Sequence, residues 1–239
     1  MANRFLTAMA AFSFGLTSPV FAANPTMTAG GGGPPNIPAS GRNVCWSEPP
    51  DLNGLLDSSE VIGHFDLETE IANDFTLSPG ATITLARWWG DYYSNNGCGD
   101  AHVATTWNLR FYDDTGCVPG DLLAEFVIPD YAGETFVACQ QGSYPIFQYE
   151  GAISFSATAG SRYWFSAQAG DHPFPPQIGR LEAGHITGCD SGFRSIYFSY
   201  PDWVFIDDVF ETHDFSQELE CGATPTERGT WGAVRLLFR

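Results

Sequence analysis

The sequence predicts an all-β fold, an antiparallel β-sandwich of jelly-roll type that disulfides stabilise. Apolar and polar residues alternate with a period of two along many short segments. Turn residues separate these segments, and no long segment shows the 3.6-residue period of a helix. Six cysteines follow an export signal. Few charged residues (16%) and many aromatic ones (15%) also suit a β-rich extracellular domain.

The chain divides into a signal peptide, an arm and one domain. Residues 1–22 read as a secretory signal, because Arg4 precedes the apolar run Phe5–Leu16 and small residues follow near Ala22. This run is too short to span a bilayer, which needs about 20 residues. We therefore expect a secreted protein without a membrane span in its mature form. Residues 23–43 are rich in glycine and proline and predict a flexible arm, and residues 44–239 predict a single β-sandwich domain.

Strands are expected along the whole domain. In Ala81–Trp89, the alternation places Ile83, Leu85 and Trp89 on one face of a half-buried strand. The strands expected in chain order are Val61–Leu67, Ile71–Leu77, Ala81–Trp89, His102–Tyr112, Leu122–Ile128, Thr135–Ala138, Pro145–Tyr149, Ile153–Ala157, Arg162–Ala169, Phe193–Ser199, Trp203–Ile206 and Thr230–Phe238.

The even number of cysteines predicts three disulfides in an exported chain. The six are Cys45, Cys98, Cys117, Cys139, Cys189 and Cys221. If successive strands run up and down, the loops with Cys98 and Cys189 fall at one end of the sandwich. The loops with Cys117 and Cys139 then fall at the other end. The first and the last cysteine would tie the start of the domain to its last strands.

The charge of the chain excludes several classes of partner. The formal net charge is −18, whereas DNA or RNA binding through phosphates needs a basic surface. An anionic membrane surface is disfavoured for the same reason. All ten residues counted as Lys or Arg are arginines. The absence of lysine excludes Schiff-base chemistry, a Walker lysine and Ser-Lys dyads from this chain.

In the stretch Arg110–Leu123, RFYDDTGCVPGDLL, two adjacent carboxylates are followed by turn residues and a third carboxylate, as in a metal-binding loop. Asp113, Asp114 and Asp121 are weak calcium candidates, because three carboxylates fall short of the six to eight oxygens that Ca²⁺ takes. The EF-hand spacing is missing. Asp-Asp-Thr-Gly and Pro-Gly are turn signals, so the alternative to a calcium site is a double turn between two strands. Apart from calcium, we expect no cofactor.

Four short motifs occur in order along the chain. They are Ala72-Asn73-Asp74-Phe75, Trp88-Trp89-Gly90-Asp91-Tyr92, Arg110-Phe111-Tyr112-Asp113 with Gly116 and Pro119-Gly120, and Gly160-Ser161-Arg162-Tyr163-Trp164. The series covers most of Ile71–Ala169 and resembles an uncharacterised group of secreted bacterial β-sandwich domains with ADDF-, WWGxY-, FYxDxGxPG- and GxxYW-like signatures. The resemblance implies export and a sandwich fold, but no activity and no catalytic residue. Cys117 stands where the group often has glycine, which supports a disulfide at that turn, and Asn73 stands where it often has aspartate.

Signs of catalysis are weak. Gly188–Gly192 is similar to the segment around a serine-protease nucleophile, with Ser191 as nucleophile and His102 as its base, but a triad also needs a buried aspartate and an oxyanion hole. Pairs of carboxylates could act as in a glycosidase, yet pairs are inevitable among 28 acidic residues. A loop cysteine and a solvated acidic surface are the simpler interpretations, so a secreted hydrolase remains an alternative.

Aromatic residues give the strongest indication of binding. Planar rings beside Asp, Asn and Gln suit sugars, which offer an apolar CH face and hydroxyl edges. The candidate ligand-binding residues are Trp88, Trp89, Tyr92, Tyr93, Asn95 and Trp164. We expect a non-enzymatic extracellular domain that binds a glycan or a cell-surface polymer. A structural subunit that self-associates into a surface layer or fibre is the second hypothesis.

Overall fold

The computed structural model describes residues 43–63, 67–93, 98, 106–129, 133–140, 144–170, 172, 174–210 and 214–222. All of them belong to one compact unit, Gly41–Arg239. The predicted signal peptide and nearly all of the arm lie outside the described residues, as do Asn95, His102 and the strand expected at Thr230–Phe238. No helix in the described part of the chain is long and apolar enough to cross a membrane.

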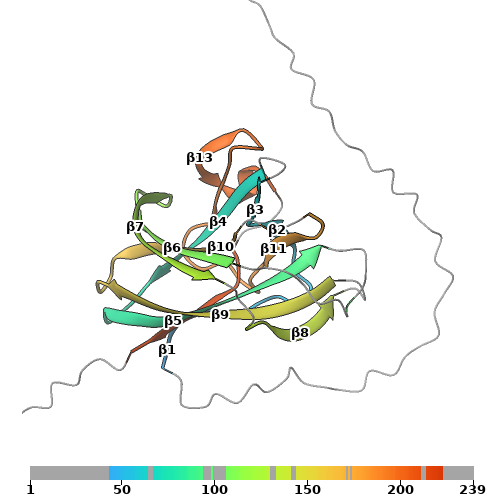
Figure 1. Cartoon of the computed structure of the whole chain (residues 1–239). Coiled ribbons are helices and arrows are strands. Elements are labelled where there is room, and N and C mark those ends of the chain that lie inside the picture. Colours follow the sequence, from blue (N-terminus) through green and yellow to red (C-terminus); the bar gives the residue numbers. More distant parts are fainter. Residues whose placement is uncertain are drawn as a thin grey trace, which may run out of the picture. The chain divides into compact units, whose positions relative to one another are not determined.

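The all-β prediction is confirmed, and every pair of strands in the two sheets is antiparallel (Figure 1). The strands of the described residues are β1 (Val44–Glu48), β2 (Leu56–Ser58), β3 (Val61–Ile62), β4 (Leu67–Thr76), β5 (Ala81–Tyr93), β6 (Thr106–Asp114), β7 (Pro119–Pro129), β8 (Thr135–Gln140), β9 (Tyr144–Ala157), β10 (Arg162–Ala169), β11 (Gln177–Leu181), β12 (Gly192–Ser195), β13 (Tyr200–Phe205) and β14 (Gln217–Cys221). A short 3-10 helix, Ile206–Asp208, follows β13.

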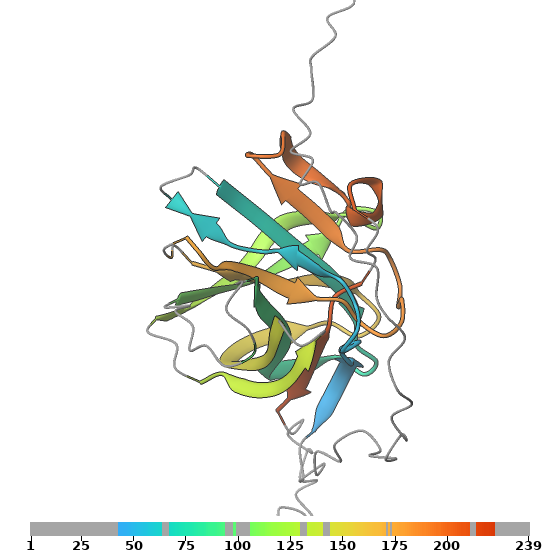
Figure 2. The same ribbon diagram turned by 90° about the vertical axis from the view of Figure 1, so that its right-hand side faces the viewer.

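The first sheet is built around β5. Strand β9 pairs along one edge of β5, and β8 extends the sheet beyond β9. The other edge of β5 is shared, because β14 pairs with Ile83–Trp88 and β11 pairs with Gly90–Tyr93. Strand β1 then pairs with β14, and β2 pairs with β11. Figure 2 shows β1 in blue beside β14 in red, so the first and last described strands are neighbours.

The second sheet has the order β13-β12-β4-β10-β6-β7, and β3 pairs with the start of β4. Strand β7 is the last of this order and pairs with β6 alone among the described strands. The two sheets pack face to face as in a sandwich, and the jelly-roll connectivity stays a prediction.

Aromatic rings from both sheets form the main core. Phe111 of β6 stacks on Phe155 of β9 with ring centroids 4.2 Å apart. Trp88 of β5 meets Trp107 of β6 at 5.1 Å in an edge-to-face contact. Both tryptophans are fully buried. These contacts span the two sheets, and large buried rings contribute much of the stability of such a core.

A β-bulge corrects the predicted faces of β5. The register shifts between Ile83 and Leu85 in the pairing with β9. Beyond this shift the side chains that face the main core are Ala86 and Trp88, whereas Trp89 belongs to a cluster on the other face. The prediction that Ile83 and Trp89 share a face was therefore wrong, because one extra residue in a bulge reverses the alternation beyond it.

The structure contains three disulfides, as expected. The bond between Cys45 and Cys221 ties β1 to β14, which confirms that the start of the domain is tied to its last strand. The other bonds are Cys98–Cys139 and Cys117–Cys189, so the grouping by ends of the sandwich was wrong. Counting strands failed because strands differ in length from two residues in β3 to fourteen in β9, and because Cys139 lies inside β8 rather than in a loop.

Candidate functional site

The tryptophans of β5 lie in the interior. Trp88 is fully buried and stacks on Tyr149, with ring centroids 5.8 Å apart. Trp89 is 6% exposed and packs against Ile146 and Leu181 on the other face of the sheet. Tyr92 is 2% exposed, and its hydroxyl donates to Glu134. Buried rings offer no face to a sugar, so their predicted role in ligand binding is corrected to packing.

Two further predicted residues, Tyr93 and Asn95, remain open. Tyr93 is the last residue of β5, where its backbone pairs with Gln177 of β11. Asn95 lies outside the described residues. Tyr93 therefore stands beside a residue that lines a surface groove, described below.

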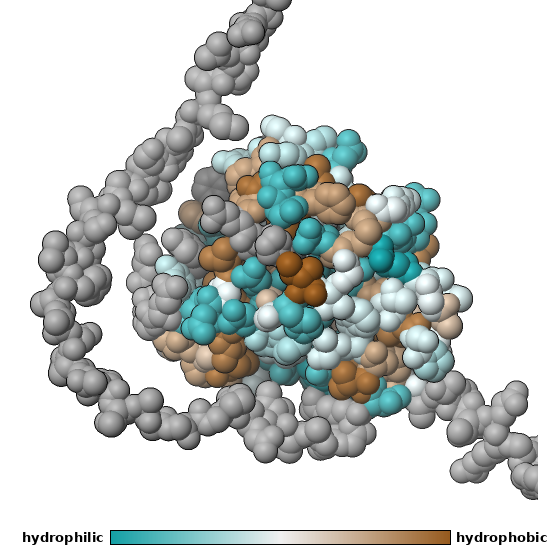
Figure 3. Space-filling model, turned by 180° about the vertical axis from the view of Figure 1, so that it is seen from behind, coloured by the Kyte–Doolittle hydropathy of each residue, from teal (hydrophilic) through white to brown (hydrophobic). Residues whose placement is uncertain are grey.

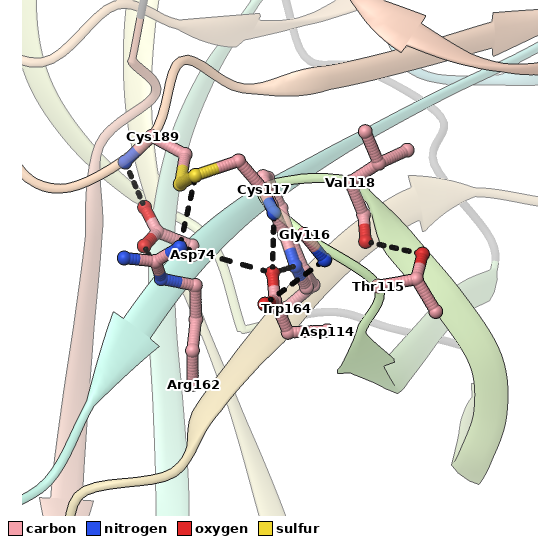
Figure 4. The surroundings of a disulfide bond; sticks show 9 residues. All are labelled: Asp74, Asp114, Thr115, Gly116, Cys117, Val118, Arg162, Trp164 and Cys189. Carbon is pink, nitrogen blue, oxygen red and sulfur yellow. Dashed lines mark hydrogen bonds and ion pairs between the residues drawn. A yellow bond between two sulfur atoms is a disulfide. The ribbon is translucent and has the colours of Figure 1, made fainter.

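Trp164 lies on the outer face of the second sheet, where it is fully buried rather than available to a ligand. Its indole N–H donates to Asp114 Oδ1 at 3.0 Å. Figure 4 shows Trp164 below the Cys117–Cys189 disulfide, with Arg162 and Asp74 beside it. The disulfide and the neighbouring Tyr112 and Trp203 belong to the same cluster as the ring, so Trp164 is part of the structure that holds this turn.

The loop after β6 is a double turn whose carboxylates bind backbone amides. Asp114 accepts from the N–H groups of Gly116 at 3.3 Å and Cys117 at 3.1 Å, as Figure 4 shows. Asp113 Oδ1 accepts from the N–H of Asp121 at 2.6 Å. The described residues contain no group of three or more His, Cys, Asp or Glu that could hold a metal. The calcium candidate is therefore corrected to a turn, because the carboxylates of Asp113 and Asp114 fix the loop, whereas Asp121 contributes its backbone N–H and has an exposed side chain.

Ser191 is buried and has an asparagine as its acceptor. Its hydroxyl donates to Asn73 Oδ1, and Asn73 in turn donates to Glu48 and, at 3.1 Å, to the carbonyl of Phe215. An amide cannot accept the proton of a nucleophile as histidine does. This chain of hydrogen bonds joins β4, β1 and the loop before β12 inside the protein, and it gives Ser191 a structural role.

The surface feature with the character of a binding site is an aromatic groove beside the β12–β13 turn. Its cavity has a volume of about 360 Å³ and is lined by Ile62, Leu67, Phe174, Gln177, Tyr197 and Phe198. The exposed fractions of the rings are 45% for Phe174, 56% for Tyr197 and 44% for Phe198. Large rings exposed together at a hollow are typical of ligand-binding surfaces.

The turn that presents two of these rings is fixed locally. Ser195 and Tyr200 are paired across the hairpin, so residues 196–199 form its tip. The Ser195 hydroxyl donates to the Glu68 carbonyl at 2.7 Å and accepts from the N–H of Phe198 at 3.3 Å. Ser199 has a positive φ of 67°, which closes the turn and leaves the rings of Tyr197 and Phe198 outside it. These two rings contact each other edge to face at 5.1 Å.

A second hollow, the acidic cavity, adjoins the aromatic groove, since Gln177 and Phe198 line both. Its volume is about 240 Å³, and its lining residues are Leu56, Asp57, Ser58, Asp91, Gln177, Ile178, Gly179, Phe198 and Phe210. Ser58, Gly179 and Asp91 are in register across β2, β11 and β5. Residues in register present their side chains on the same face. Gly179 carries no side chain between the other two, and the backbone oxygen of Asp57 lies 3.0 Å from the position that a Cβ of Gly179 would take.

A buried pair of side chains, Glu60 and His172, lies next to the cavity wall at Ile178. Glu60 Oε2 accepts from the N–H of Ile178 at 2.6 Å and lies 2.9 Å from His172 Nε2. Glu60 Oε1 accepts from the hydroxyl of Ser58 at 2.7 Å. These bonds fix the chain between β2 and β3 against β11, so the walls of the acidic cavity are preformed rather than assembled by a ligand.

Asp91 is the unusual residue of the acidic cavity. It is 1% exposed, and neither carboxyl oxygen has a side-chain hydrogen-bond partner among the described residues. Desolvation by burial raises the pKa of Asp91 to about 8, and the only opposing contribution is a hydrogen bond from the backbone of Tyr92. A carboxyl with a strongly raised pKa at a cavity is a recognised sign of a functional site.

A third hollow, of about 110 Å³, lies beside Glu70 and Arg194 on the outer face of the second sheet. Glu70 is buried, and Arg194 donates to it with Nε at 3.0 Å. Arg110 lies 3.1 Å from the same carboxylate, and the two arginines lower the pKa of Glu70 against the effect of its burial. The guanidinium of Arg194 also stacks over Trp203 at 4.6 Å. Because these charges are paired with one another, the cluster holds the sheet together and offers little to a ligand.

Sequence reasoning missed the groove because its residues carry no motif. Phe193–Ser199 was expected to be one strand, whereas β12 ends at Ser195 and the remaining residues form the turn. The signal was the run Ile196-Tyr197-Phe198, three large apolar residues of which the structure exposes 70%, 56% and 44%. Elsewhere the surface is mixed, and Figure 3 shows hydrophobic side chains scattered among hydrophilic ones on one face.

No family model, no curated protein and no solved structure matches the chain. The resemblance to secreted β-sandwich domains therefore stays a prediction.

Proposed function

We propose that this protein is an extracellular, non-enzymatic binding domain for glycans and that the aromatic groove with the adjoining acidic cavity is its binding site. The observation that carries the proposal is the gathering of Phe174, Tyr197 and Phe198, each at least 44% exposed, around a hollow that also contains the amide of Gln177. Exposed rings can stack on the CH faces of sugars, and the amide can bond their hydroxyl groups.

The site supports binding to an extended ligand. Because the groove and the cavity share Phe198 and Gln177, their hollows follow each other along one surface. The rings come from a fixed turn and from Phe174 just before β11, so little side-chain entropy is lost when a ligand settles. The three disulfides and the predicted export signal agree with a role outside the cytoplasm.

The test is co-sedimentation of the oxidised protein with a panel of insoluble polysaccharides. We expect pelleting with at least one polymer, and a loss of at least tenfold in affinity for the double variant Tyr197→Ala/Phe198→Ala, because each ring that a sugar covers contributes on the order of 1 kcal/mol through buried apolar area. Phe136→Ala is the matched control, since Phe136 on β8 is 53% exposed but lines neither hollow. Equal losses in the two variants, or binding that survives both, would contradict the proposed site.

A second candidate function is self-association into a layer or fibre, and strand β7 favours it. This edge strand of eleven residues exposes Leu122 (51%), Leu123 (48%) and Val127 (56%). A long apolar edge is a template for pairing with another chain. Sedimentation velocity at rising protein concentration is expected to show oligomers that Val127→Lys removes, because a lysine on the edge blocks strand addition. A protein that stays monomeric at millimolar concentration would argue against this function and leave the groove proposal untouched.

A further inference from the structure

We propose that the acidic cavity is the subsite for a protonated amine, so that the glycan recognised by this domain carries amino groups, as a polymer of glucosamine does. The inference deepens the proposed function and rests on it. Two features of the cavity together specify a cation: a buried carboxyl and aromatic walls.

The carboxyl is that of Asp91. It has no side-chain partner among the described residues, it lines the cavity, and it lies in register with Gly179 and Ser58 on one face of the sheet. A buried carboxyl without a counter-charge is costly, and an ammonium group supplies the missing charge together with hydrogen-bond donors.

The walls are suited to the same ligand. Phe198 and Phe210 both line the cavity, and aromatic faces attract alkylammonium groups through their negative electrostatic potential. The remaining polar side chains on the lining are Asp57, Ser58 and Gln177, and no described lining residue is an arginine or a histidine. The net charge of −18 also draws cations toward the protein.

The described groups that face Asp91 include no cation. From β9, the phenol of Tyr149 interacts with it; on its own strand, the backbone of Tyr92 donates to it; across β11 lie Asp57 and Ser58. Burial raises the pKa of Asp91 to about 8, and a cation beside the carboxyl favours its ionised form. Binding of an ammonium at pH 7 is therefore expected to release a proton from Asp91 to the buffer.

The alternative chemistry is an acetamido group, whose carbonyl could accept a hydrogen bond from a protonated Asp91. The two ligands make opposite demands on the carboxyl, because an amine needs it ionised and an acetamide needs it protonated. Three tetrasaccharides with the same β-1,4 backbone distinguish them: the glucosamine, N-acetylglucosamine and glucose tetramers.

The experiment is isothermal titration calorimetry of the full-length oxidised protein with these three probes at pH 7, in two buffers of different ionisation enthalpy and at 0.3 M NaCl. We expect the glucosamine tetramer to bind at least tenfold more tightly than the glucose tetramer, with proton release to the buffer. Asp91→Asn should reduce the ratio of the affinities for the glucosamine and glucose tetramers to about one, and it should abolish the proton release. The control Asp121→Asn removes one exposed carboxylate on β7 and should change neither.

The outcomes separate the two proposals. Equal binding of the three tetramers that Tyr197→Ala/Phe198→Ala weakens would overturn the amine subsite and keep the glycan groove. Preference for the N-acetylated tetramer would also overturn the amine subsite. If no tetramer binds, the second comparison is butylammonium against butanol. Binding of butylammonium that Asp91→Asn abolishes would keep the amine subsite and overturn the glycan proposal. Absence of butylammonium binding would overturn both proposals. Thermal unfolding of Asp91→Asn shows whether the variant is folded.

Discussion

Raising the pH from 5 to 8 is expected to lower the free energy of unfolding of this domain. Burial raises the pKa of Asp91 to about 8 and that of Glu48 to about 8, and it raises the pKa of Asp214 to about 7. In the unfolded chain these groups titrate near pH 4, so in this window the folded protein binds more protons than the unfolded one. Stability then falls as the pH rises, by up to about 1.4 kcal/mol per pH unit for each such carboxyl.

Asp91 is the clearest of these groups, because only the backbone of Tyr92 opposes the effect of its burial. For Glu48, burial raises the pKa first, the charge of Asp214 raises it further, and the hydrogen bond from Gln217 lowers it, so Glu48 and Asp214 do not titrate independently. We therefore expect the free energy of unfolding to fall by a total on the order of 3 kcal/mol between pH 5 and pH 8, which is less than the sum that the three carboxyls would give if they titrated independently.

Glu70 acts in the opposite direction but outside this window. Arg110 and Arg194 lower the pKa of Glu70 below its usual value. A lowered pKa stabilises the fold above the pKa of the unfolded chain, and this contribution is lost only as the pH falls through the folded value. Glu70 is thus ionised throughout pH 5 to 8, and the greatest stability is expected near pH 5.

Urea unfolding at several pH values measures this effect. Asp91→Asn and Glu48→Gln each remove one titrating group with little change of shape, so each should flatten the dependence of stability on pH. The exposed Asp121 gives the control, since Asp121→Asn should leave the slope unchanged. A wild-type stability that is constant or rises from pH 5 to 8 would show that these carboxyls are ionised in the folded protein.

The alternation of residues predicted the sandwich because it is a local property of each strand. Strands β6 and β10 bury every second side chain in the main core, and the sequence pattern records this directly. Which face of the sheet is covered is not local. Trp164 lies on the outer face and was expected to bind a ligand, yet Tyr112 and the Cys117–Cys189 disulfide pack with it.

Long-range contacts explain the other failures. Four strands, β1, β2, β11 and β14, were not predicted, since they are three to five residues long and owe their conformation to their neighbours. The acidic cavity joins Asp91, Asp57 and Phe198, which are far apart in the chain. Their proximity follows from the register of β5, β11 and β2 and from the position of the β12–β13 turn, and single-sequence patterns contain neither.

Removing the disulfide between Cys45 and Cys221 is expected to cause the largest loss of stability of any single cross-link in this domain. The bond joins residues 176 apart in the sequence, whereas the other two span 41 and 72. In the chain-entropy model, a loop of this length restricts the unfolded state by about 5 kcal/mol. The Cα atoms lie 5.7 Å apart within paired strands, so the bond closes a contact that the folded protein makes anyway.

The loss would also reach the interior, because β1 carries Glu48. This residue accepts from Asn73 of β4 and from Gln217 of β14, so separation of β1 would expose the polar network between the sheets. We expect Cys45→Ser/Cys221→Ser to lower the unfolding temperature by roughly 10–20 °C, at about 2–4 °C per kcal/mol for a domain of this size. Differential scanning calorimetry measures the change.

The comparison variant is Cys98→Ser/Cys139→Ser, which opens the shortest loop and should cost about 4 kcal/mol in the same model. The informative result is which of the two double variants loses more stability. If the Cys98–Cys139 variant is the less stable one, the strain or packing around each bond outweighs loop length. If Cys45→Ser/Cys221→Ser costs under about 1 kcal/mol, the pairing of β1 with β14 and the bonds of Glu48 already hold the two ends of the domain together, and the disulfide adds little.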